Sequence, residues 1–202
     1  MSRQPRVKHS RGRSSRRVGT RELRQRFLIV CEGEQTEPNY FRAFQVPGLV
    51  VKIEDSNARG WKLVARAEQL RDADEYDQVW CVFDRDDLQP AQIAEALQRA
   101  DKAGIELAFS NQAFELWYLL HFDYHNTAIS RKDYCDRLEK KLAHGYAKNS
   151  VGMYELLLKR QQTAITNARR LLALYDPWRP AEHDPSTTVH QLVEELNKHR
   201  RP

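Results

Sequence analysis

The sequence predicts an α/β fold, in which a mostly parallel four-stranded sheet has helices on both faces and is followed by a helical C-terminal part. Three observations support this prediction. Strand-like and helix-like segments alternate from residue 27 to about residue 109, an order typical of parallel sheets with crossover helices. The strand-like segments are short apolar runs rich in β-branched and aromatic residues, as in buried parallel strands. Beyond Ser110 the pattern becomes helical.

The four predicted strands are bounded by charged or turn-forming residues. They are expected at 27–31, 49–53, 78–83 and 105–109. In open α/β sheets, ligands bind beyond the carboxyl ends of such strands. Residues that directly follow a strand are therefore the first candidates for a functional site.

The helices are predicted from spacing and from their end signals. Those between the strands are expected at 36–44, 61–72 and 90–103, and those of the C-terminal part at 111–122, 131–143, 150–174 and 187–199. Thr36 can cap the first helix, with Pro38 in its first turn. Pro90 can open the third, and Gly104 can end it.

The charge of the chain is divided unevenly along its 202 residues. Residues 1–26 hold ten Lys and Arg against one Glu, which leaves 23 basic and 27 acidic residues in the rest. We expect a basic, disordered arm over 1–23, because that stretch has almost no large apolar residues. The arm suits contacts with nucleic-acid phosphates, although a tail that only aids solubility explains it equally well. The residues expected to contact nucleic acid are Arg11, Arg13, Arg16 and Arg17 in the arm and Arg24 directly after it.

The remaining residues, 24–202, are predicted to form one domain, with an α/β core over 24–125 and a helical extension over 126–202. No segment has the roughly 18 to 20 apolar residues of a membrane span, and the N-terminus has no apolar core of a secretion signal. The three cysteines lack a CxxC pair, so a cytoplasmic protein is expected. Without GxGxxG or GxxxxGK[ST], dinucleotide-binding and P-loop functions lack their main support.

Two acidic clusters follow two of the predicted strands. Glu32 comes after the first strand and is followed by Gly33, which permits a tight turn. Asp84 and Asp86 come after the third strand, and their spacing of two places both side chains on one side if the segment is extended. Carboxylates at two strand ends predict a shared site for Mg²⁺, or Mn²⁺, which prefer oxygen ligands. The alternative is that these acids only solvate loops or cap helices.

Two further residues are candidates for the same site. Glu115 lies in a segment that is apolar on nearly all sides, so it is expected to be buried and either paired with an Arg or functional. In the predicted helix it shares a face with Asn111. Lys148 could stabilise charge on a reacting phosphate, or it could be a solvated surface lysine.

Four blocks of the sequence resemble the RloB-like family and, more distantly, the Toprim nuclease fold, which is Rossmann-like. They are Cys31–Glu37 with Tyr40-Phe41, then Phe83–Asp86, then Ser110–Phe122, and finally Asp184–Val189. The resemblance covers roughly residues 24–200 and leaves out the basic arm. It implies that Glu32 is the Toprim glutamate, an acid/base or a metal ligand. It also implies that Asp84 and Asp86 are the metal-binding DxD pair, whereas Glu115 has no general Toprim counterpart.

The family is associated with restriction and abortive-infection loci in bacteria and archaea, which implies a role in anti-phage defence. The leading hypothesis is a Mg²⁺-dependent nuclease that hydrolyses DNA or RNA, with Arg85 or Lys148 holding the backbone. The alternatives are a non-catalytic nucleic-acid-binding accessory of a defence or restriction system and, more weakly, a nucleotidyl- or phosphotransferase. A defence-system ATPase, a restriction protein and a second copy of the chain are candidate partners.

Overall fold

The first half of the chain forms the alternating strands and helices of a parallel sheet. The computed structural model describes residues 24–46, 48–143, 145–148, 150 and 152–200. The four long strands are β1 (Gln25–Cys31), β2 (Leu49–Asp55), β3 (Gln78–Asp84) and β4 (Glu106–Asn111). The helices that connect them are α1 (Thr36–Arg42), α2 (Trp61–Asp72) and α3 (Pro90–Ala103). All seven elements lie where the sequence predicts them, with small differences at their ends.

The sheet has five strands, in the order β2-β1-β3-β4-β5. The first four are parallel, whereas β5 (Ser186–Thr187) runs antiparallel to β4. The predicted α/β class and mostly parallel sheet are confirmed, but the predicted count of four strands is wrong. Two residues are too few to show the alternating pattern by which a strand is recognised in a sequence, so β5 was missed.

The second half of the chain is helical, but its helices are shorter than predicted. They are α4 (Glu115–Leu120), α5 (Arg131–Lys141), α6 (Met153–Leu157), the 3₁₀ helix η1 (Leu158–Arg160), α7 (Gln161–Leu172) and α8 (Val189–Lys198). The predicted helix over 150–174 is divided into three pieces. The helix predicted from residue 111 begins only at Glu115, because β4 continues as far as Asn111.

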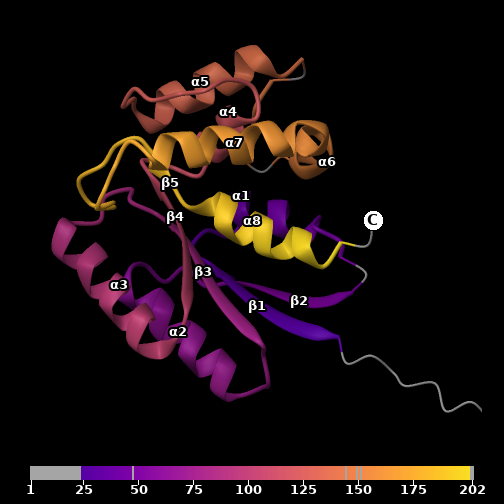
Figure 1. Cartoon of the computed structure of the whole chain (residues 1–202), viewed down its shortest axis with the longest axis vertical. Coiled ribbons are helices and arrows are strands. Elements are labelled where there is room, and N and C mark those ends of the chain that lie inside the picture. The colour runs from indigo at the N-terminus through magenta and orange to yellow at the C-terminus, as the bar shows by residue number, and fades with distance from the viewer. Residues whose placement is uncertain (1–23, 47, 144, 149, 151, 201–202) are drawn as a thin grey trace, which may run out of the picture.

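Helices cover both faces of the sheet, as predicted (Figure 1). Side chains alternate between the faces of a strand, and β1 shows this clearly. Leu28 and Val30 pack in a core with α2 and α3. Phe27, Ile29 and Cys31 pack in a larger core with α1, α4, α7 and α8. The sheet and the helices of the second half of the chain therefore pack together in the larger of the two cores.

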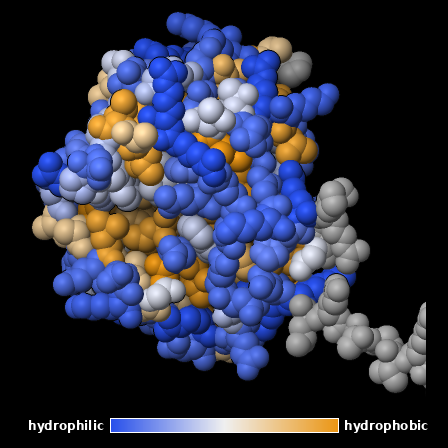
Figure 2. Space-filling model, in the orientation of Figure 1, coloured by the Kyte–Doolittle hydropathy of each residue, from blue (hydrophilic) through white to orange (hydrophobic). Residues whose placement is uncertain are grey.

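The surface in Figure 2 is mostly hydrophilic, with smaller hydrophobic areas between the charged side chains. Among the described residues, the large apolar side chains that are exposed are those of Val50, Leu156, Leu158 and Leu174. No helix within the described residues has the length and apolar character needed to cross a membrane. The predicted arm over 1–23 lies outside the described residues.

Thr188 fastens the segment after β5 to the edge of the sheet. Its backbone N–H donates to the carbonyl of Phe109 at 2.9 Å, and its Oγ1 accepts from the Phe109 N–H at 2.9 Å. The same hydroxyl donates to the carbonyl of Leu107 at 3.2 Å. The side chain of Thr188 thus replaces the backbone partners that a longer β5 would supply to β4.

We expect Thr188→Val to lower the free energy of unfolding by about 1–3 kcal/mol, because it leaves the Phe109 N–H without its partner in a buried place. Urea denaturation measures this change. Thr166→Val is the matched control, since the Thr166 hydroxyl is exposed and bonds only within its own helix. Equal effects of the two substitutions would contradict the role assigned to Thr188.

Candidate functional site

Glu32 and Asp84 lie side by side at the carboxyl edge of the sheet. Glu32 directly follows β1, and its backbone N–H donates to the carbonyl of Val82 in the neighbouring strand β3 at 2.9 Å. Asp84 is the last residue of β3. Both residues are buried, with 9% of Glu32 and 6% of Asp84 exposed. The two central strands therefore place one carboxylate each at the same edge, as the sequence predicts.

Asp86 lies near these two residues, but its backbone conformation differs from the predicted one. The chain turns after β3, and Asp86 has a φ of 42°, in the left-handed region rather than in an extended conformation. The spacing argument for Asp84 and Asp86 is therefore wrong, because it assumed an extended segment. The two side chains nevertheless lie near each other, since both form ion pairs with the guanidinium of Arg131.

Two arginines connect the three carboxylates into a continuous chain of ion pairs. Arg59 lies between β2 and α2, and its Nε is 3.0 Å from Glu32 Oε1 while its Nη2 is 3.1 Å from Asp86 Oδ2. Arg131 is the first residue of α5. Its Nη2 is 3.1 Å from Asp84 Oδ2, and its Nη1 is 3.2 Å from Asp86 Oδ1. Sequence reasoning missed both arginines, which are far from the acids along the chain.

Burial strongly affects the protonation of the carboxylates. Desolvation raises the pKa of Glu32 to about 7, although the neighbouring Arg59 opposes this effect. Desolvation also raises the pKa of Asp84 well above its ordinary value, and the nearby Glu37 and Glu115 add to the increase while Arg131 opposes it. Perturbed carboxyl groups gathered in a cleft are a feature of functional sites, because catalysis uses such shifts.

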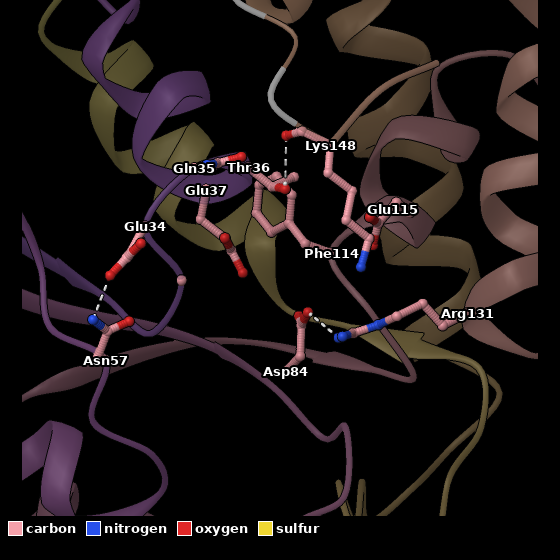
Figure 3. Close-up of a pocket in the computed structure, with 11 residues that line it drawn as sticks. Glu34, Gln35, Thr36, Glu37, Asn57, Asp84, Phe114, Glu115, Arg131 and Lys148 are labelled. Carbon is pink, nitrogen blue, oxygen red and sulfur yellow. Dashed lines mark hydrogen bonds and ion pairs between the residues drawn. The ribbon is translucent and has the colours of Figure 1, made fainter. Parts of the chain in front are cut away.

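A cavity of about 350 Å³ opens next to Asp84. Glu37, Asp84, Glu115, Arg131 and Lys148 contribute to its lining, and their side chains point toward a common space in Figure 3. Glu37 was not predicted, although it lies in the same block as Glu32. It is buried at the start of α1, and desolvation raises the pKa of its carboxyl group.

Glu115 is buried as predicted, with 3% exposed, but its partner is a tyrosine rather than an arginine. The hydroxyl of Tyr146 donates to Glu115 Oε1 at 3.0 Å. Asn111 does not share a helix face with Glu115, because Asn111 ends β4. Its side-chain amide donates instead to the carbonyl of His183 at 2.9 Å.

Lys148 is exposed and lies at the same cavity, where its carbonyl accepts a hydrogen bond from Thr36 Oγ1 at 3.1 Å. Of the other predicted basic contacts, the two that the structure describes, Arg24 and Arg85, are not brought to this place. Arg85 is not one of the described residues that line the cavity. It lies near Asp184, whose pKa is raised by burial, and the positive charge of Arg85 partly opposes that increase. Arg24 is exposed just before β1, at the opposite end of that strand from Glu32. Arg11, Arg13, Arg16 and Arg17 lie outside the described residues.

The carboxylate cluster offers a divalent cation two unused oxygens. Glu32 Oε2 and Asp84 Oδ1 are buried and have no hydrogen-bond partner in the part of the chain that the structure describes. Hard oxygens of this kind fit Mg²⁺ and Mn²⁺. Both oxygens of Asp86 are held by arginines. Within the described ranges, no three His, Cys, Asp or Glu side chains already stand close enough together to hold a metal. The magnesium site stays a prediction.

Comparison with known proteins identifies a family whose members this chain resembles. The model of the family described as RloB-like protein matches residues 27–196. That range includes every described residue of the carboxylate cluster and of the cavity. Searches of curated proteins and of solved structures found no match.

Because the pKa of Glu32 is about 7 in the folded protein against an ordinary 4.5, stability should fall as pH rises through this range. There the unfolded chain releases its proton while folded Glu32 keeps it, so ionisation favours the unfolded state. Glu32→Gln cannot ionise, so it should gain on the order of 2 kcal/mol relative to wild type from pH 4.5 to 7. Urea unfolding across this range measures the difference. Glu95→Gln, at an exposed position on α3, is the control, and parallel curves for wild type and Glu32→Gln would contradict the assignment.

The Tyr146 hydroxyl is expected to support the buried Glu115. Tyr146→Phe removes a hydrogen bond to this carboxyl group and should reduce the free energy of unfolding by about 1–3 kcal/mol. Tyr134→Phe is the matched control, because the buried hydroxyl of Tyr134 has no partner among the described residues. Denaturation of both variants tests the difference, and a loss of stability in Tyr134→Phe alone would refute it.

Proposed function

Because the chain belongs to the RloB-like protein family, we propose that it is a Mg²⁺-dependent nuclease that hydrolyses phosphodiester bonds of DNA or RNA in anti-phage defence. The observation that carries the proposal is the convergence of Glu32, Asp84 and Asp86 at the carboxyl edge of two adjacent parallel strands. This edge is where α/β sheets bind ligands. We also propose that the sheet is a Toprim-like core, in which these residues are the glutamate and the DxD pair.

Each residue of the site has a proposed role. Glu32 and Asp84, each with a buried oxygen that has no partner among the described residues, would hold the metal together with Asp86. Bound Mg²⁺, or Mn²⁺, would supply an activated water and would stabilise charge on the scissile phosphate. Lys148 at the cavity contacts a phosphate oxygen, and Glu115, close to it, is a further acidic group for proton transfer.

Basic residues outside the cavity are proposed to hold the nucleic-acid backbone. Arg11, Arg13, Arg16 and Arg17 of the arm, with Arg24, would contact phosphates without reading sequence, and Arg85 would do so nearer the cluster. Such contacts make binding weaker as salt increases. A cytoplasmic location, in agreement with three free cysteines, and a defence-system ATPase, a restriction protein or a second copy as partner are part of the same proposal.

One observation favours the second candidate function, a non-catalytic nucleic-acid-binding accessory. Arg59 and Arg131 already neutralise most of the charge of the three carboxylates, as they would in a site that has kept its acids for structural reasons. In that case nucleic-acid binding should survive both chelation and Asp84→Asn.

We expect Asp84→Asn to lower metal-dependent cleavage by at least about a hundredfold, because it removes the charge that holds the cation. The assay uses duplex DNA, single-stranded DNA, total RNA and tRNA with Mg²⁺, Mn²⁺ or EDTA. Asp87→Asn is the matched control, since Asp87 is an exposed acid of the same loop. The proposal predicts cleavage by wild type and Asp87→Asn only, and none in EDTA.

Two other results would decide against the nuclease. Cleavage that persists in both EDTA and Asp84→Asn would show that it does not depend on this cluster. Salt-sensitive binding without cleavage of any substrate, unchanged in Asp84→Asn, would favour the binding accessory.

A further inference from the structure

We propose that Arg59 is a displaceable counter-cation of the carboxylate cluster, which competes with the metal for Glu32 and Asp86 and leaves when the metal binds. This inference rests on the metal site of the proposed function and adds a mode of regulation to it. Its basis is the arrangement of the two arginines, which differ in how firmly the fold holds them.

The side chain of Arg59 is held mainly by the two carboxylates. It is 54% exposed, whereas the side chains of Glu32 and Asp86 are only 10% and 20% exposed. Its backbone lies in the segment between β2 and α2, outside any helix or strand. The guanidinium can therefore move into solvent without uncovering the hydrophobic core.

Arg131 is held more firmly. Its side chain is 32% exposed, and it is the first residue of α5. The start of this helix is fixed by a capping box in which Ser130 and Asp133 exchange hydrogen bonds. Of the two arginines, Arg59 is therefore the one that can leave at the smaller cost.

The charges of the cluster indicate why one arginine should leave. Glu32, Asp84 and Asp86, when ionised, carry one more charge than the two guanidiniums balance. A divalent cation bound to the same carboxylates would place two further positive charges beside both guanidiniums. The resulting repulsion favours departure of the guanidinium that the fold holds less firmly.

Departure of Arg59 would also complete a ligand set. It would free Glu32 Oε1 and Asp86 Oδ2, in addition to the unused Glu32 Oε2 and Asp84 Oδ1. Three carboxylates would then present oxygens to one cation. While Arg59 occupies the cluster, the metal cannot use these oxygens. The apparent affinity for the metal therefore falls in proportion to the fraction of molecules in which Arg59 is absent from the cluster.

The test measures Mn²⁺ binding to the full chain by electron paramagnetic resonance of the free ion. A pH of about 8.5, well above the ordinary pKa of carboxyl groups, is used for all variants. The proteins are wild type, Arg59→Ala, Asp84→Asn and Arg42→Ala. Arg42 is the matched control, because it is 46% exposed and pairs with Asp55 at 3.2 Å, outside the cluster.

We expect Arg59→Ala to bind Mn²⁺ roughly fivefold more tightly than wild type, as removal of a competing state predicts. Arg42→Ala should match wild type, and Asp84→Asn should lose the site. If Asp84→Asn loses the site but Arg59→Ala binds equally or more weakly than wild type, the competitor role is wrong while the metal site stands. If neither wild type nor Arg59→Ala binds Mn²⁺, both proposals are overturned.

Discussion

The burial of carboxylates at the ends of β1 and β3 is the constraint on which the rest of the site depends. A carboxylate removed from water is unfavourable unless a positive charge or hydrogen bonds compensate it. The two central strands supply Glu32 and Asp84, but the compensating groups come from elsewhere, namely Arg59 from a loop and Arg131 from the helical extension. Ion pairing at the edge and hydrophobic packing on the face therefore hold the extension against the same sheet.

The parts of the fold that follow from local pattern were predictable. Each of the four long strands contains a short run of mostly apolar residues. The helix α3 has Pro90 at its start and Gly104, in the left-handed conformation, at its end. Features that depend on distant partners were not predictable. The strand β5 exists because Thr187 and Ser186 pair with the end of β4. The same pairing keeps Asn111 in a strand, although the sequence pattern there predicts a helix.

The candidate site divides in the same way. The positions of Glu32 and Asp84 follow from strand order alone, because parallel neighbours end at one edge. The predicted metal ligands and catalytic residues keep the status of proposals. The two arginines and the cavity-lining Glu37 could not be identified, since a pairing such as Asp84 with Arg131 is set by the packing of α5 and not by spacing. The only signal for Glu37 was its place in the block that begins at Cys31.

The left-handed backbone at Asp86 limits which residues this position can accept. Asp86 has a positive φ, a conformation in which the Cβ of most residues comes too close to the neighbouring carbonyl oxygen. Gly has no Cβ, and the short polar side chains of Asp and Asn offset the collision through local hydrogen bonds. The backbone conformation therefore restricts which residue types fit at this position, whatever their charge. Asparagine alters the electrostatics of the cluster while it keeps the turn, whereas glutamate keeps the charge but strains the turn. A carboxylate at this point of the loop is thus most readily provided by aspartate.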